Sequence, residues 1–200
     1  MAARTTRGSK RYHHGDLRRA LIEEGAIMLE EVGADGISLR ALARRVGVSH
    51  AAPGHHFADR NTLLAELAAD GFRLLRQRIE RALEEDDPYL AAGRAYIDVA
   101  LERPNTFTLM FGGLPGGLAA GDCPPRLAEE STAAFMALLR VAGVDVDPDQ
   151  PAGDYRLTSV ELRTWALVHG AATLFINGAL NVSRERFSDL VTEMLARPSP

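Results

Sequence analysis

Apolar residues recur at intervals of three and four along most of the chain, the spacing that places side chains on one face of a helix. In residues 16–32 this stripe includes Leu21, Met28 and Leu29. Further helices of this kind are predicted in residues 60–87, 88–102, 104–111, 126–142, 158–180 and 183–195. The alternation of polar and apolar residues that marks a half-buried strand is not found. With the two short helices described next, the pattern predicts an all-α protein of about nine helices.

Two short helical segments meet at a tight turn within residues 37–64. Ser38 is placed to cap the first segment, because a serine oxygen accepts hydrogen bonds from the free N–H groups of a first helical turn. Gly47 follows that segment and supplies the left-handed conformation that a sharp exit requires. Ser49 is placed to cap a second, very short helix that ends near Phe57. This order predicts a helix-turn-helix, whose second helix enters the major groove of DNA.

Stretches rich in Gly, Pro or Asp divide the remaining helical segments. Residues 112–125 and 143–155 are predicted loops, and residues 1–11 show no periodicity and are expected to form a mobile arm. We therefore expect two domains. Residues 1–60 hold the arm and the helix-turn-helix, and residues 61–200 form a second, helical domain.

The net charge of −4 conceals an uneven distribution. Residues 1–60 carry a charge of +3 and the remaining residues carry −7. A basic end on an acidic body indicates a surface that binds phosphate. The basic residues of the arm either form a solvated tail or lie along DNA, and the sequence leaves both open. These residues are Arg4, Arg7, Lys10 and Arg11.

Cysteine usage and hydropathy place the chain in the cytoplasm. The single cysteine, Cys123, has no partner within the chain for a disulfide, which fits a reducing compartment. The N-terminus is basic and polar, so no signal peptide is expected. No run of about 20 apolar residues is present, so no membrane span is expected either.

Residues 12–64 resemble the N-terminal DNA-binding domain of TetR/AcrR-type transcriptional regulators. The resemblance rests on the Gly-Ile-Ser-Leu-Arg segment, on Ala43 with Gly47, on Val48-Ser49, on Phe57 and on Leu63-Leu64. Near the other end, Trp165 with His169-Gly170 is similar to the Trp/His-Gly signature of one type of TetR C-terminal domain. The resemblance implies a regulator, usually a repressor, that binds a palindromic operator as a homodimer and is released by a small molecule.

Seven residues are candidates for contacts with DNA. Side chains at the start of the second short helix reach base edges in such a domain, as histidine by hydrogen bonds and alanine by contact with a thymine methyl group. These residues are Ser49, His50, Ala51, His55 and His56. Arg40 and Arg60 flank the motif and are candidates for phosphate contacts, and Arg60 falls where the family commonly has a phosphate-contacting lysine. Arg44 and Arg45 are interpreted as a solvated face.

Gly54 departs from the family pattern, which usually has an aromatic residue at this position. That aromatic residue helps to position the second short helix and contacts a phosphate. Glycine removes the contact and costs roughly 1 kcal/mol of helix propensity. Pro53 lies directly before it, in the first turn of the expected helix. Together the two residues predict a short and loose recognition helix.

The second domain must contain a cavity if it senses a ligand. Candidate lining residues are Tyr96, Phe107, Met110, Phe111, Phe135, Met136, Trp165, His169 and Phe175. A pocket of this composition suits a small, partly hydrophobic molecule. Residues of these types more often belong to a packed core than to a ligand site.

The last two helices are apolar on more than one side. Residues 165–180 are apolar almost all round, and a stripe in the final helix includes Phe187, Leu190 and Met194. Two interpretations remain open. The helices either belong to the core of one chain or pair with their two-fold mates as a four-helix bundle in a homodimer, which the family resemblance favours.

Competing chemistry has little support in the sequence. The adjacent pairs His13-His14 and His55-His56 diverge on a helix, and no Cys or carboxylate lies at metal-ligand spacing from them, so neither a metal nor a cofactor is expected. No nucleophile motif and no phosphate-binding glycine loop is found. The alternatives to a ligand-released repressor are a DNA-binding dimer without a ligand and, more remotely, a small α-helical enzyme.

Overall fold

The computed structural model describes residues 14–112, 123–144 and 158–196, and these residues form eight α-helices and one 3-10 helix. The all-α prediction is confirmed. The bounds are α1 (His14–Gly36), α2 (Leu39–Val46), η1 (Ala52–His55), α3 (Arg60–Ala82), α4 (Pro88–Glu102), α5 (Pro104–Gly112), α6 (Pro125–Val141), α7 (Ser159–Ile176) and α8 (Arg184–Leu195). The predicted N-terminal arm and most of the two predicted loops lie outside the described residues.

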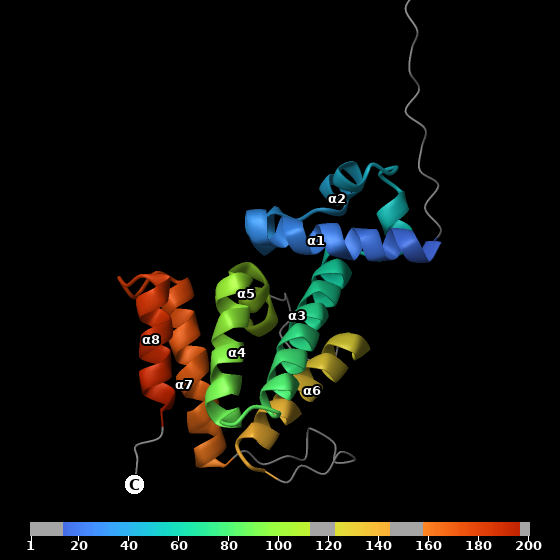
Figure 1. The fold of residues 1–200 in the computed structure, drawn as a ribbon. Coiled ribbons are helices and arrows are strands. Elements are labelled where there is room, and N and C mark those ends of the chain that lie inside the picture. The colour runs from blue at the N-terminus through green and yellow to red at the C-terminus, as the bar shows by residue number, and fades with distance from the viewer. Residues whose placement is uncertain (1–13, 113–122, 145–157, 197–200) are drawn as a thin grey trace, which may run out of the picture.

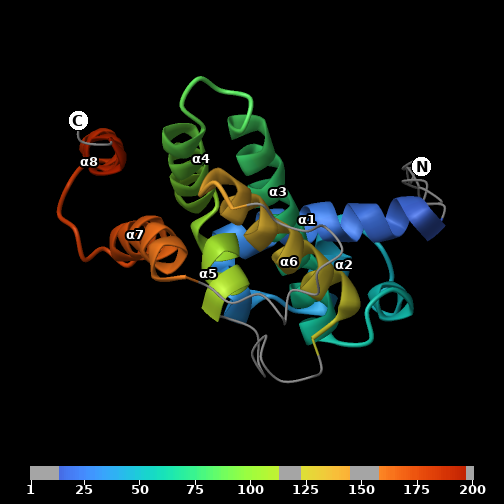
Figure 2. The same cartoon turned by 90° about the horizontal axis from the view of Figure 1, so that it is seen from below.

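Helix α3 runs from the helix-turn-helix into the second domain and forms the centre of the molecule. Helix α1 lies across its upper end with α2 beyond, and α4, α5 and α6 pack around the lower part of α3 (Figure 1). Helices α7 and α8 lie together at the opposite side of α4 from α3, as the view from below also shows (Figure 2). The helix-turn-helix and the α7–α8 pair therefore occupy different ends of the molecule.

The core follows the apolar face of α3. Leu63, Leu64, Leu67, Leu75 and Ile79 are all at most 2% exposed. Asp59 caps the helix by accepting a hydrogen bond from the backbone N–H of Thr62 at 2.7 Å. Burial of a leucine or isoleucine side chain contributes about 1.5–3 kcal/mol, so this face joins the helix-turn-helix and the following helices in one core.

The seventh helix ends earlier than the predicted residue 180. Gly178 has a φ of +69°, and the N–H of Ala179 donates to the carbonyl of Leu174 at 2.9 Å. This left-handed glycine closes the helix at Ile176, because the chain turns back on its last carbonyls. Ser183 caps α8 as predicted, since its hydroxyl accepts from the N–H of Arg186 at 3.2 Å.

Within the described ranges, no helix combines the length and the apolar character that crossing a membrane would require.

Candidate nucleic-acid interface and ligand pocket

The first half of the helix-turn-helix is built as the sequence predicts. The hydroxyl of Ser38 accepts from the N–H of Ala41 at 3.1 Å and begins α2. Gly47 has φ 78° and ψ 32°, and its N–H donates to the carbonyl of Ala43 at 3.0 Å. A side chain in this left-handed conformation is strained, so glycine permits the sharp exit from α2. Both predictions are confirmed.

The second half of the motif differs from the prediction. Residues 52–55 form one turn of 3-10 helix in place of an α-helix, and Ala51 precedes it without a side-chain cap. Ser49 does not cap this turn through its hydroxyl, and its carbonyl accepts from the N–H of Ala52 at 3.0 Å. Pro53 donates no hydrogen bond and Gly54 weakens helix formation, so the segment forms only a tight turn.

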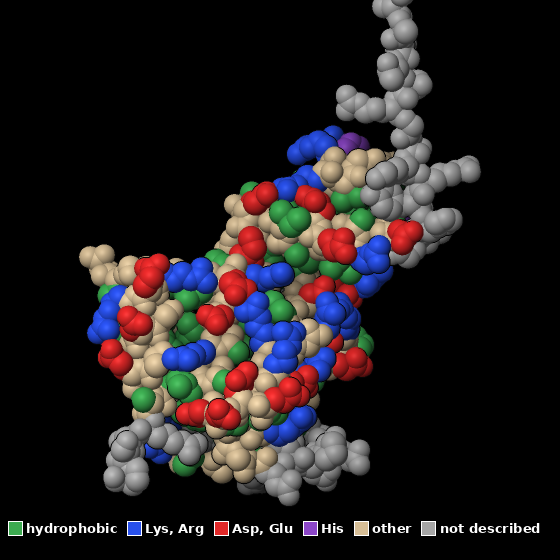
Figure 3. Space-filling model, in the orientation of Figure 1, with side chains coloured by type: hydrophobic (Ala, Val, Ile, Leu, Met, Phe, Trp, Pro, Cys, Tyr) green, Lys and Arg blue, Asp and Glu red, His purple; other side chains and the backbone are tan. Residues whose placement is uncertain are grey.

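Most of the predicted DNA-binding residues face solvent at one end of the molecule. Arg40 on α2, together with Ser49, His50, Ala51 and His55 on and before η1, is exposed, and His56 is half-buried. Basic side chains and a histidine lie at this end, and acidic side chains lie below them (Figure 3). The surface offers hydrogen-bond donors over a short, convex segment, as a groove-reading element requires. Contact of these residues with DNA stays a prediction.

Arg60 is engaged within the protein in this structure. Its guanidinium donates to the carbonyls of Ile37 at 3.1 Å and Ala34 at 2.6 Å, and lies 3.5 Å from a carboxylate oxygen of Asp35. It therefore fastens the start of α3 to the connection between α1 and α2. The phosphate contact predicted for Arg60 stays a prediction. Within the protein, Arg60 positions the start of α3 against the end of α1.

Arg45 is exposed, as the interpretation of a solvated face implies, and it also pairs with two carboxylates of the neighbouring helix. Its guanidinium donates to Glu24 at 2.6 Å and forms a two-pronged contact with Glu31, both on α1. The hydrogen bonds and charges of Arg45 hold the pKa of Glu31 below its usual range, and those of the two glutamates raise the pKa of Arg45. Arg45 thus fixes α2 against α1. The sequence does not distinguish a solvated arginine from one that pairs with another helix. The two partners of Arg45 lie 14 and 21 residues away in the chain, so no local spacing reveals them.

An aromatic cluster in the second domain is centred on Tyr96 of α4. The indole N–H of Trp165 donates to the Tyr96 hydroxyl at 3.2 Å, and that hydroxyl lies 2.9 Å from Nδ1 of His169. Because Trp165 has only a donor, the Tyr96 hydroxyl accepts from it, and the tautomer of His169 sets the direction of the second hydrogen bond. Phe107 and Phe111 of α5 complete the cluster, with ring centroids 5.6 and 6.3 Å from Tyr96.

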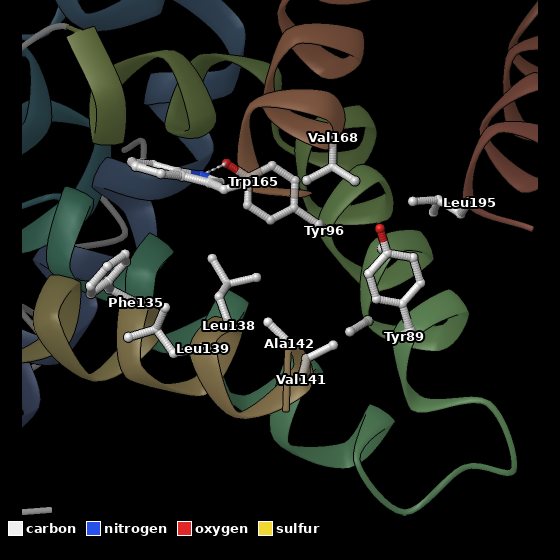
Figure 4. Close-up of a pocket in the computed structure, with 12 residues that line it drawn as sticks. Tyr89, Tyr96, Phe135, Leu138, Leu139, Val141, Ala142, Trp165, Val168 and Leu195 are labelled. Carbon is white, nitrogen blue, oxygen red and sulfur yellow. Dashed lines mark hydrogen bonds between the residues drawn. The ribbon is translucent and has the colours of Figure 1, made fainter. Parts of the chain in front are cut away.

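A pocket adjoins this cluster between α4, α6 and α7 (Figure 4). In this structure the cavity has a volume of about 30 Å³, so a ligand of ordinary size would have to widen it. Three predicted residues, Tyr96, Phe135 and Trp165, line it. The remaining lining residues are Tyr89, Ala92, Gly93, Leu138, Leu139, Val141, Ala142, Val168 and Leu195. Phe135, Leu138, Leu139 and Ala142, on α6 and its C-cap, recur at i, i+3, i+4 and i+7, and that repeat was the signal available in the sequence.

Six residues predicted to line a cavity do not line this pocket. Phe107, Phe111 and His169 stand behind Tyr96 in the aromatic cluster. Met110 packs against α3 at Gly71, and Phe175 stacks on Phe187 of α8 with ring centroids 4.4 Å apart. Met136 is buried. Large apolar side chains fill a core as readily as they line a cavity, so residue type alone did not separate the two.

Burial lowers the pKa of His169 from its ordinary value near 6.5. The folded state therefore favours neutral His169, while the unfolded chain takes up a proton as the pH falls below about 6.5. We expect the stability of the protein to fall between pH 7.5 and pH 5.5. Urea unfolding at the two pH values checks this, and His169→Gln is expected to lose part of the dependence. An unchanged dependence in the variant would show that other groups cause it.

Apolar side chains remain exposed on α7. Leu167 and Leu174 are 38% and 49% exposed, and a side chain at Gly170 between them would meet no other atom. On α8 the predicted stripe is divided, because Phe187, Val191 and Leu195 are buried within the chain while Leu190 and Met194 are half-buried. One face of the pair thus belongs to the core and another is uncovered. Among the described residues, no cluster of three His, Cys, Asp or Glu side chains could hold a metal ion.

Comparison with known proteins gives a family for this architecture. Residues 89–197, more than half of the chain, match the family model described as "Tetracyclin repressor-like, C-terminal domain". The chain belongs to the TetR family of transcriptional regulators. This membership agrees with the helix-turn-helix, and it supports the prediction of a regulator over that of a small enzyme.

Relatives of this TetR-family chain include proteins of known structure. A protein with unknown function from Rhodococcus sp. RHA1 is 34% identical with a TM-score of 0.71, covering 94% of this chain and 97% of that one. AibR, solved in complex with isovaleryl coenzyme A and operator DNA, shares the fold with 14% identity and a TM-score of 0.61, covering 88% and 96%. The HTH-type transcriptional regulator Rv1816 of Mycobacterium tuberculosis is 29% identical over 158 residues, which are 76% of this chain and 64% of that protein. The chain thus spans slightly less than two thirds of this curated relative.

The effect of Gly54 on DNA binding by this TetR-family regulator can be tested directly. A Cβ built at Gly54 meets no atom within 4 Å, and the residue is exposed. Gly54→Tyr is therefore expected to fold normally and to tighten binding to an operator fragment about fivefold, roughly 1 kcal/mol for one new hydrogen bond to phosphate. Gly54→Ala is the control, since it restricts the backbone without adding the contact. Weaker binding by Gly54→Tyr, measured by fluorescence anisotropy, would contradict the placement of this residue.

Proposed function

We propose that this TetR-family regulator is a repressor that binds a palindromic operator as a homodimer and is released by a small, uncharged, partly hydrophobic molecule. The observation that carries the proposal is the aromatic-lined pocket in the domain to which α3 connects the helix-turn-helix. Occupancy of the pocket would tilt α3 in each subunit and change the separation of the two DNA-reading turns. A half-site match that depends on this separation would then be lost.

The lining of the pocket supports the chemical class of the ligand. Among the described residues that line it, none carries a charge at neutral pH, and the polar side-chain groups are the hydroxyls of Tyr89 and Tyr96 and the indole N–H of Trp165. A charged ligand would lose its hydration without gaining a partner of opposite charge, at a cost of several kcal/mol. An uncharged molecule with an aromatic or aliphatic body and one or two hydrogen-bonding groups fits better.

The uncovered face of α7 supports the homodimer. Leu167, Gly170 and Leu174 lie on one side of the helix, and half-buried Leu190 and Met194 on α8 are the apolar residues of the adjoining helix that remain open to contact. Gly170 lets a second helix approach closely. A second copy of the chain related by a two-fold axis would cover this face with its own, as a four-helix bundle.

Three finer assignments belong to the same proposal. The chain divides into a DNA-binding domain, residues 1–60, and a ligand-binding and dimerisation domain, residues 61–200. The second domain is of the Trp/His-Gly type, and the bonds of Trp165 and His169 to one hydroxyl on α4 give that signature a structural reason. As a DNA-binding protein the regulator would act in the cytoplasm.

Selection of bound sites from a random DNA library tests the DNA-binding part of the proposal and provides the operator. We expect an enriched palindrome whose half-site centres lie about one helical turn, roughly 34–36 Å, apart or at a multiple of that distance. Binding to the selected site should weaken steeply as salt is added, because phosphate contacts release counterions. A library that yields no enriched motif after repeated rounds would contradict the proposal.

A further inference from the structure

Glu30 of α1 caps the first turn of α5, which belongs to the other domain. Its carboxylate accepts from the backbone N–H of Asn105 at 3.1 Å and from that of Thr106 at 2.9 Å. The hydroxyl of Thr106 donates to the same carboxylate at 2.6 Å, and the side-chain amide of Asn105 donates to the Glu30 carbonyl at 3.0 Å. Figures 1 and 2 show the C-terminal part of α1 lying over this end of α5.

The capping is complete for this helix. Residue 104 is a proline and has no N–H, and the N–H of Phe107 already donates to the carbonyl of Arg103 at 2.8 Å. Asn105 and Thr106 therefore carry the free N–H groups of the first turn, and Glu30 binds both. A carboxylate at a helix N-terminus is further stabilised by the helix dipole.

Helix α5 is wedged between three partners. A Cβ at Gly71 of α3 would lie 2.6 Å from the sulfur of Met110 and 2.7 Å from Cγ2 of Thr106, so α5 packs closely on α3. On its other side, Phe107 and Phe111 contact the Tyr96 ring, which lines the pocket. Phe107 directly follows Thr106 in the chain. A shift of the Tyr96 ring thus acts on the turn that Glu30 caps.

We propose that the bond between Glu30 and the first turn of α5 couples the pocket to the DNA-binding domain, in addition to the continuous helix α3. The proposal rests on the proposed function, because it describes how occupancy of the same pocket reaches α1. Glu30 is a positioning residue. It holds α1, and through the Arg45 contacts it holds α2, in a place set by α5.

The test is a double-mutant cycle in which a large side chain takes the place of a ligand in the pocket. Ala142 lines the pocket, so Ala142→Trp fills it without the need for an identified ligand. Operator affinity is measured for the wild type, Ala142→Trp, Glu30→Gln and the double variant. Glutamine has the size of Glu30, but one of the two accepting oxygens becomes an N–H₂ group. That group cannot accept a hydrogen bond from the N–H groups of Asn105 and Thr106. We expect Ala142→Trp to weaken operator binding about tenfold or more in the wild type and less than about threefold in the Glu30→Gln background.

A matched control comes from the same helix. Glu23 is exposed on α1 and pairs with Arg19 without touching α5, so Glu23→Gln should leave the full effect of Ala142→Trp. Hydrogen exchange at the amides of Asn105 and Thr106 should be faster in Glu30→Gln than in the wild type.

The outcomes separate the coupling from the proposed function. An equal effect of Ala142→Trp with and without Glu30 would overturn the coupling and leave the ligand-released repressor intact. Unchanged exchange at Asn105 and Thr106 in Glu30→Gln would overturn the coupling as well. An Ala142→Trp variant that binds the operator as tightly as the wild type would contradict the proposed function, and the coupling would fall with it.

Discussion

Replacing Leu174 by glutamate is expected to convert the proposed homodimer into folded monomers with greatly weakened operator binding. Leu174 is 49% exposed in the single chain, so the new charge remains hydrated there and the fold is kept. In the proposed dimer the same side chain is buried against the partner. An unpaired buried charge costs several kcal/mol, and about 4 kcal/mol corresponds to roughly a thousandfold rise in the dissociation constant of the dimer. Sedimentation and operator titration measure the two effects.

A matched variant separates this effect from a general loss of apolar surface. Ile27 is 52% exposed on α1, which lies across the upper end of α3, whereas α7 and α8 stand on the other side of α4 (Figure 1). Ile27→Glu is therefore expected to remain a dimer. A Leu174→Glu protein that is still dimeric at micromolar concentration, or a wild type that is a folded monomer, would contradict the proposed interface.

Gly71→Val is expected to be strongly destabilising. The first atom of any side chain at this position would lie well inside contact distance of Met110 and Thr106, and valine adds two methyl groups. Overpacking of this kind costs about 1–3 kcal/mol. For a chain of this size that loss lowers the melting temperature by roughly 2–12 °C. Differential scanning calorimetry checks the expected change.

Gly112 provides the control for this substitution. It lies at the end of the same α5 helix, and a Cβ there would meet no atom within 4 Å. Gly112→Val should therefore change the stability by no more than about 0.5 kcal/mol. If Gly71→Val melts at the same temperature as the wild type, α5 does not pack on α3 as closely as described.

Local signals in the sequence were sufficient for much of the fold. Ser38 and Gly47 act on neighbours three or four residues away, so the bounds of α2 followed from residue type and spacing. Ser183 likewise fixes the start of α8. Helical periodicity placed the remaining helices, since it reflects the one face that each must bury. The second short helix is a single 3-10 turn, in line with the short and loose helix that Pro53 and Gly54 predict, and only the cap expected from Ser49 is not formed.

Contacts between residues far apart in the chain could not be predicted from the sequence. Arg45 pairs with Glu24 and Glu31, and Glu30 binds the first turn of α5. In the sequence, each of these charged residues on its own is indistinguishable from a solvated surface residue. The pocket is likewise a property of packing. Tyr96 and Phe107 are both buried aromatic residues, yet only the first lines it. Such sites depend on how helices approach one another, which a periodic pattern does not encode.

Reciprocal linkage between the pocket and DNA tests the central claim most directly. N-phenyl-1-naphthylamine, an uncharged aromatic dye, serves as the occupant, and its fluorescence gives its affinity for the pocket. A coupling of about 1–3 kcal/mol predicts that the dye weakens operator binding by roughly 5–150-fold. Thermodynamics then requires the operator to weaken dye binding by the same factor. Dye affinities that are identical with and without operator DNA would contradict the account and leave the second domain as a platform for dimerisation alone.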